Sequence, residues 1–348
     1  MNFCKQLGMV LVLVCLTGTA FALKVTWEGG SGPMNPEIQD FIDDITDEIG
    51  GINDKPEKLI KGFANASVYS SHAATQRAFG DYKTLSVTLG AIVGIQIPSD
   101  AASIKKELEN TDDLGKLLED RGGDMALGLN VQGTFQFGLN SSFLVDGLYL
   151  GLRLGYANIS DISGVSFKMF HIGPVAHFRL LKGMDVGVFK WRGITAGAGF
   201  LYQKTNLNIK YVVEDVETGD SSSNYTIAKP KLVFDMDIAT CTIPVEVNTA
   251  IQLLWFLNLN AGIGADISFG KNVTTLGLRA DVYNNFTHSN EGALVIKAGG
   301  KMNPKKFNPK IMGNLGLKFG PVIIDVPVAY YFGEDPGLNM GVTLGVVF

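Results

Sequence analysis

Cysteine, histidine and charge are scarce in this sequence. Its 348 residues include three cysteines and four histidines, and only 18% of them are charged, whereas 46% are hydrophobic. There are 34 acidic and 29 basic residues, for a formal net charge of -5. A chain without a basic excess is a poor ligand for phosphate backbones, so we expect no nucleic-acid partner. The high hydrophobic content also excludes a mostly disordered chain.

The first 22 residues predict an exported protein. A positively charged start is followed by the apolar run Gly8–Leu16, and the sequence Ala-Phe-Ala at 20–22 has the form of a signal peptidase site. The run is too short for a transmembrane helix, which needs about 20 apolar residues. Removal of this segment also removes Cys4 and Cys15. The mature chain then keeps only Cys241 and can form no disulfide within itself.

Long hydrophobic runs are missing after the predicted signal peptide, although the composition stays apolar. No segment approaches 18 consecutive apolar residues, so we expect no membrane-spanning helix. Apolar residues recur instead at every second position, opposite a face rich in Gly, Asn, Gln and Thr. The alternation is clearest at 127–139, 148–156, 256–268, 276–283 and 338–348. This pattern is typical of a transmembrane β-barrel.

We therefore expect an all-β fold, a transmembrane antiparallel β-barrel of about twelve strands, with fourteen as the alternative. The expected strands are 83–97, 125–140, 146–158, 165–180, 189–211, 227–243, 251–268, 273–286, 292–302, 309–319, 322–332 and 338–348. The region 60–82 could hold a further strand. Because such barrels have short periplasmic turns and longer extracellular loops, both termini are expected on the periplasmic side. The competing interpretation is a secreted β-sandwich, whose strands are usually about 5 or 6 residues long.

The domain organisation follows as a signal peptide (1–22), a helical N-terminal segment (23–82) and the barrel (83–348). Asn35 and Pro36 start a predicted amphipathic helix that ends at Gly50, with an acidic outer face. It is either a periplasmic helix below the barrel or a plug inside the lumen. A second helix is expected at 101–121, in the first outer loop, as a lid or as a surface element.

Motifs for catalysis, metal binding or nucleotide binding are absent from the sequence. It contains no HExxH, CxxC, GxSxG or GxxxxGK[ST]. We expect a protein that is not an enzyme and that has no cofactor and no metal site. The candidate ligand-contacting or pore-lining residues are Arg153, His177, Arg179, Arg279 and Asp281. The alternative for them is a solvated pore lining with no fixed ligand.

The last strand, 338–348, alternates strictly and ends in Phe348. It resembles the C-terminal strand of bacterial outer-membrane proteins, which the barrel-insertion machinery recognises. This resemblance implies an outer-membrane location, contact with membrane lipid and the insertion machinery as a partner. The segment before the first strand, with Gly62 to Ala66 just upstream of it, resembles in architecture the FadL-type fatty acid transporters, in which an N-terminal hatch plugs the barrel. That resemblance implies a small hydrophobic ligand.

The expected function is passive passage of a small or hydrophobic solute through the barrel, gated by the N-terminal segment. The alternative is a surface protein that transports nothing, such as an adhesin, for which the barrel is only an anchor.

Overall fold

The computed structural model describes residues 24–28, 55–72, 85–97, 126–139, 147–212, 216–217, 225–284 and 289–348. The predicted signal peptide and the predicted helices at 35–50 and 101–121 lie outside these residues. The described part contains one helix, α3 (Lys55–Ser70). No helix of the described part is long and apolar enough to cross a membrane.

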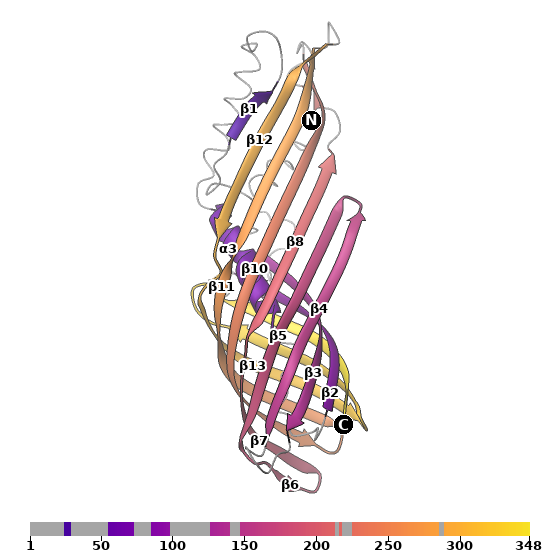
Figure 1. Ribbon diagram of the computed structural model, residues 1–348, viewed down its shortest axis with the longest axis vertical. Coiled ribbons are helices and arrows are strands. Elements are labelled where there is room, and N and C mark those ends of the chain that lie inside the picture. Colours follow the sequence, from indigo (N-terminus) through magenta and orange to yellow (C-terminus); the bar gives the residue numbers. More distant parts are fainter. Residues whose placement is uncertain are drawn as a thin grey trace, which may run out of the picture.

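The strands form one antiparallel sheet that closes into a barrel (Figure 1). They are β1 (Lys24–Glu28), β2 (Leu85–Gln96), β3 (Ala126–Leu139), β4 (Leu148–Ile162), β5 (Val165–Leu181), β6 (Met184–Val186), β7 (Phe189–Gly199), β8 (Leu201–Val212), β9 (Val216–Glu217), β10 (Tyr225–Leu253), β11 (Leu257–Asn284), β12 (Asn290–Met302), β13 (Phe307–Phe319), β14 (Val322–Tyr331) and β15 (Gly337–Val347). Pairing of β15 with β2 closes the ring. The prediction of an all-β antiparallel barrel is confirmed.

The ring has ten strands, where the sequence suggested about twelve. Two pairs of expected strands each form one strand of the ring. The strands expected at 251–268 and 273–286 are joined in β11, which runs unbroken through 269–272. The strands expected at 292–302 and 309–319 are β12 and β13, which lie end to end along β11. Their pairing with β11 keeps a single register, from Asn272 opposite Met302 to Ile267 opposite Phe307. β7 and β8 are likewise two pieces of the single strand expected at 189–211. The region 60–82, which could have held another strand, contains part of α3 instead.

Apolar side chains face outward from the ring and polar side chains face inward. On β4, Leu150, Leu152 and Leu154 are exposed on the outside, whereas Arg153 between them is fully buried inside. On β3, Asn130, Gln132 and Thr134 are buried inside. This distribution is the reverse of that in a water-soluble protein and is the distribution of a transmembrane barrel.

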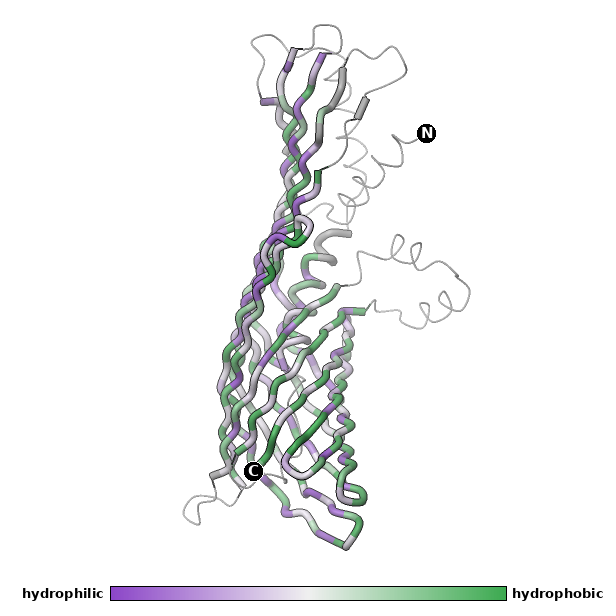
Figure 2. The backbone as a smooth tube through the Cα atoms, turned by 90° about the vertical axis from the view of Figure 1, so that its right-hand side faces the viewer, coloured by the Kyte–Doolittle hydropathy of each residue, from purple (hydrophilic) through white to green (hydrophobic). Residues whose placement is uncertain are grey.

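β10, β11 and β12 continue beyond the ring as a tall sheet, visible in Figures 1 and 2. We call residues 225–238, 272–284 and 290–302 the extension. Here the two faces of β10 and β11 exchange polarity. On β10 the inward residues change from Thr242 and Thr240 to Ile238 and Met236, and the outward residues change from Val245 to Asp237. An apolar inner face and a charged outer face suit water, so the extension lies outside the lipid.

The inner face of the extension forms a hydrophobic core. Its buried members are Leu232, Phe234, Met236, Ile238, Leu276, Leu278, Ala280, Val282, Leu294, Ile296 and Ala298, together with Ile60 of α3. The outward apolar run on β10, from Cys241 to Leu253, marks the lipid-facing part of the same strand. A transmembrane strand needs about 9–11 residues, which this run supplies.

Aromatic side chains mark both ends of the lipid-facing band. Phe170 and Tyr202 contact one another, with ring centroids 6.5 Å apart, at the level where the extension begins. At the other end Phe256 stacks with Phe319, at a centroid distance of 6.3 Å, beside Trp255. Aromatic belts at both interfaces are a feature of membrane barrels.

The first described strand, β1, and the last residue, Phe348, lie at opposite ends of the molecule. Phe348 pairs with Leu85 at the start of β2, at the end of the ring away from the extension. β1, in contrast, pairs with β12 inside the extension (Figure 1). For β1 this differs from the expectation that both termini lie on the periplasmic side. The expected N-terminal segment, 23–82, was placed in the periplasm or in the lumen, whereas β1 lies beyond the ring and α3 carries the chain from there into the lumen.

Candidate functional site: a helix held in the barrel lumen

α3 occupies the lumen at the level where the extension begins (Figure 2). Pro56 stands in its first turn, where a missing N–H breaks no helical hydrogen bond. Every residue from Ala64 to His72 is buried, and the helix contacts strands on all sides of the ring: β2, β3, β10, β11 and β15. Its buried residues are mostly small or polar, which suits a polar lumen.

Two glycines let the helix backbone touch the barrel wall. Gly94 and Gly128 are register partners on β2 and β3. A Cβ atom added at Gly128 would lie 2.3 Å from the backbone oxygen of Ala66, and one at Gly94 would lie 2.5 Å from the same oxygen. Neither position can hold a larger residue unless α3 moves. At Gly337 of β15, a Cβ atom would likewise collide with the ring of Tyr69.

Side-chain hydrogen bonds hold α3 along its length. Asn65 donates to Gln96 Oε1 at 2.7 Å, and its Oδ1 accepts from the backbone N–H of Lys305 at 2.7 Å. Gln203 donates to the hydroxyls of Ser67 and Ser70, at 3.2 and 3.4 Å. Asn272 donates to the backbone oxygen of Ile60 at 2.9 Å. The contacts are thus polar and come from β2, β8, β11 and the segment before β13.

Below α3 lies a buried network of four charges. Lys310 Nζ is 2.6 Å from Glu246 Oε1 and 2.7 Å from Asp266 Oδ1. Arg153 is the second cation, and all four residues are at most 3% exposed. Two cations and two anions cancel, which is how such groups tolerate burial.

His72 joins the helix to this network. Arg153 Nη1 donates to His72 Nδ1 at 2.6 Å and to the His72 backbone oxygen at 3.1 Å. His72 Nε2 lies 2.5 Å from Glu246 Oε1. Since Nδ1 accepts, the proton must reside on Nε2, and the imidazole is neutral.

Tyr69 and Tyr331 form a second connection. Their rings stack at a centroid distance of 4.2 Å, and the Tyr331 hydroxyl donates to Asp266 Oδ2 at 3.0 Å. Tyr69 donates to the backbone oxygen of Asp335 at 2.7 Å. Asp266 therefore binds both Lys310 and a tyrosine that supports the helix.

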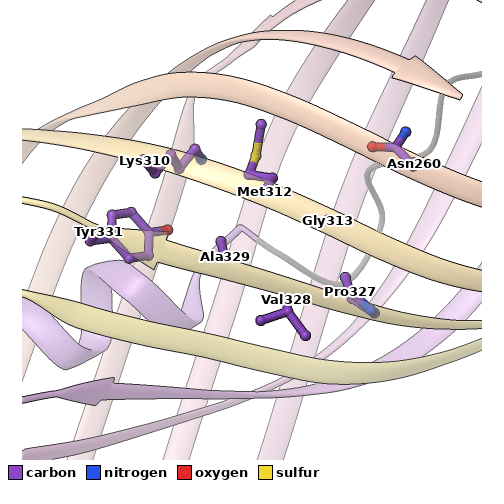
Figure 3. Close-up of a pocket in the computed structure, with 8 residues that line it drawn as sticks. All are labelled: Asn260, Lys310, Met312, Gly313, Pro327, Val328, Ala329 and Tyr331. Atoms are coloured by element: carbon purple, nitrogen blue, oxygen red, sulfur yellow. The ribbon is translucent and has the colours of Figure 1, made fainter.

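The space beside the network is small. A cavity of about 10 Å³ lies next to Lys310 and Tyr331, lined also by Asn260, Met312 and Ala329 (Figure 3). That volume holds about one water molecule. Within the described ranges, no three His, Cys, Asp or Glu side chains are placed to hold a metal ion.

Comparison with known proteins adds a family. The family model described as Lsa36-like matches residues 20–348. The chain belongs to the Lsa36-like family. No curated protein sequence matches it.

Solved structures similar to this Lsa36-like chain are bacterial barrels. The translocator domain of the autotransporter NalP from Neisseria meningitidis has 12% identity and a TM-score of 0.30, covering 76% of this chain and 89% of that one. The Ralstonia pickettii toluene transporter TbuX has 9% identity and a TM-score of 0.27, with coverages of 83% and 99%. LpxR from Salmonella typhimurium has 10% identity and a TM-score of 0.25, with coverages of 75% and 100%.

The five predicted site residues of the Lsa36-like barrel fall into two groups. Arg153, His177 and Arg179 face the lumen, where His177 lies 3.5 Å from Gln136 Nε2 and Arg179 donates to the Tyr149 hydroxyl. Arg279 and Asp281 do not line the lumen. They lie in the extension, and Arg279 is half-exposed and pairs with Glu28 of β1 at 2.6 Å.

The predicted site residues include Arg153 but not His72, Glu246, Asp266 or Lys310, the other members of the network. Glu246 and Lys310 occupy inward positions on strands whose outward residues are apolar, such as Val245 and Ile311. A single charged residue at an inward position of such a strand was the sequence feature that could have identified Glu246 and Lys310. For His72 the sequence offered none, since its segment does not alternate.

Proposed function

We propose that the protein is an outer-membrane barrel that passes a small solute by diffusion, and that α3 is its gate. In this proposal the predicted signal peptide exports the chain, and the C-terminal strand directs it to the insertion machinery. The solute crosses only when α3 leaves the lumen. The polar wall, rather than an apolar pocket, then selects what passes. The small hydrophobic ligand implied by the FadL-type resemblance is part of the proposal only as one class of solute.

The observation that carries the proposal is the set of hydrogen bonds between α3 and the wall, which stands beside apolar contacts of Ile60, Val68 and Tyr69. The bonds of Asn65, Ser67, Ser70 and His72 can all be replaced by bonds to water when the helix leaves. Each such exchange has a net cost of about 1 kcal/mol. A helix held by a large apolar surface would instead resist hydration. Polar contacts therefore support a reversible plug.

Single-channel conductance in a planar bilayer tests the proposal. Arg153→Met removes the cation that binds His72, and we expect conductance steps that are rare or absent in the unchanged protein. Arg279→Met is the matched control, because it removes the same kind of side chain outside the lumen. The control should conduct like the unchanged protein. Heat-dependent migration on a gel shows that each variant is a folded barrel.

Silence of the folded Arg153→Met variant would contradict the gate. It would favour the second candidate function, in which the barrel is a sealed anchor for the extension. The specific observation behind that candidate is the exchange of polarity along β10, which places a sheet with charged outer residues such as Lys231, Asp235 and Asp237 beyond the lipid.

A further inference from the structure

We propose that the chain threads its own barrel. The segment that carries β1 crosses the membrane through the lumen and is displayed on the side of the extension, opposite to Phe348. The barrel thus translocates a polypeptide, its own N-terminal segment. This inference depends on the position of α3 and not on the passage of any solute.

The first observation is the attachment of β1 to the extension. Its five residues pair with β12, from Lys24 opposite Lys297 to Glu28 opposite Ala293. The Glu28 carboxylate binds Arg279 of β11 at 2.6 Å, and the Trp27 ring packs against the extension core. β1 is therefore a strand of the extension sheet, beyond the lipid-facing band.

The second observation is the direction of α3. Ile60, near its start, belongs to the hydrophobic core of the extension and accepts a hydrogen bond from Asn272. His72, just after its end, lies among Arg153, Glu246 and the other charges inside the ring. The chain therefore runs from the extension into the lumen.

The third observation is the start of β2. Leu85 and Phe348 exchange backbone hydrogen bonds, of 2.8 Å from the Phe348 N–H and 3.4 Å from the Leu85 N–H. β2 thus begins at the end of the ring farthest from the extension. Between Glu28 and Leu85 the chain passes from one side of the lipid-facing band to the other, and α3 lies within the ring on that path.

The fit of α3 limits what can take this path. At Gly94 and Gly128 the helix backbone touches the strand backbone, so no folded unit wider than one helix could pass beside this wall. We infer that the segment crosses as an unfolded or helical chain, before β1 pairs with β12. The substrate class is therefore a polypeptide in an unfolded or helical form.

The orientation follows from the turns. The two longest connections between ring strands, residues 97–125 and 213–224, lie at the extension end, although the two-residue turn between β4 and β5, residues 163–164, lies there too. At the Phe348 end, β10 and β11 are joined by residues 254–256, and β13 and β14 are joined by residues 320–321. In outer-membrane barrels the longer loops face the outside and the short turns face the periplasm. The extension and β1 then face the outside of the cell.

Cysteine labelling in intact cells tests the inference. In a Cys241→Ser background, single cysteines are placed at Glu28 of β1, at Ser163 in the turn between β4 and β5, and at Met184 of β6. All three positions are exposed. The probe is a maleimide that does not cross the outer membrane. We expect Glu28→Cys and Ser163→Cys to react in intact cells, and Met184→Cys to react only after the outer membrane is permeabilised.

Reaction of Glu28→Cys only together with Met184→Cys would overturn the inference. A second measurement tests directly whether β1 pairs with β12. Thr26 and Val295 are register partners, so the pair Thr26→Cys and Val295→Cys should form a disulfide on oxidation. Absence of this disulfide in folded barrels would also overturn the threading. A silent Arg153→Met channel, in contrast, would leave it intact.

Discussion

Substitution of Gly128 tests directly whether α3 packs against β3 inside the ring. In Gly128→Val the new Cβ would lie 2.3 Å from the backbone oxygen of Ala66, and the first atom it meets belongs to the helix backbone. A rotamer change cannot relieve that contact. An ordinary separation is at least 3.4 Å, so the helix must withdraw by about 1 Å.

Such a withdrawal breaks the hydrogen bonds on this side of the helix. Three bonds would lengthen most: the Asn65–Gln96 bond and the two bonds from Gln203 to Ser67 and Ser70. At about 1 kcal/mol each, their loss destabilises the docked helix by about 3 kcal/mol. This corresponds to a roughly 100-fold rise in the undocked population.

The assay is the maleimide labelling rate of a Ser71→Cys reporter in a Cys241→Ser background. Ser71 is buried when α3 is docked and its hydroxyl bonds only within the helix, to the backbone oxygen of Val68, so the reporter leaves the three counted bonds in place and reacts only through the undocked state. Gly128→Val should accelerate labelling about 100-fold. Gly277→Val is the matched control, because a Cβ at this strand glycine would meet nothing within 4 Å. An unchanged rate in a folded Gly128→Val barrel would refute the reasoning.

Three further predictions concern charge. His72 is neutral when docked because its Nδ1 accepts from Arg153, whereas a hydrated histidine takes up a proton below about pH 6.5, so acid favours undocking. Labelling of Ser71→Cys, divided by that of an exposed Ser163→Cys so that the loss of thiolate in acid cancels, should rise by up to about tenfold per pH unit below about 6.5, a dependence that His72→Gln should lose. Lys310→Met leaves its two carboxylate partners buried and should lower the free energy of unfolding in vesicles by about 3–5 kcal/mol, measured by urea titration; a loss below about 1 kcal/mol would contradict the network. Val247→Arg, in the lipid-facing band, should cost about 2–4 kcal/mol in the same titration, and Val233→Arg, outward on the same strand but in the extension, should cost less than about 1 kcal/mol; equal costs would contradict the assigned membrane boundary.

The alternation of apolar and polar residues was enough to predict the barrel. Inward and outward residues differ so consistently on β3, β4 and β15 that the face of each side chain could be assigned from the sequence. The strand count was harder, because the alternation exchanges polarity where β10 and β11 leave the lipid. Gly270, Lys271 and Asn272 look like a turn in the sequence, yet β11 continues through them in the extended sheet.

The same exchange explains the misplaced site residues. Arg279 and Asp281 alternate with apolar residues, as Arg153 does, but in the extension the apolar face points inward and the charges point outward. The assembly of Arg153, Glu246 and Lys310 could not be predicted, because it depends on pairing across the ring. α3 itself was not predicted: the alternative of a plug was stated for the helix expected at 35–50, which lies outside the described residues. The small residues of α3, such as Ala66 and Ser67, became meaningful only beside Gly94 and Gly128.

The most direct test of α3 as the closure of the lumen is the conductance of the barrel with and without residues 23–72. Both forms are refolded, checked for heat-dependent migration on a gel and inserted into planar bilayers under the same conditions. The account predicts a closed full-length barrel and regular conductance steps after truncation. Equal conductance in the two folded forms would contradict it.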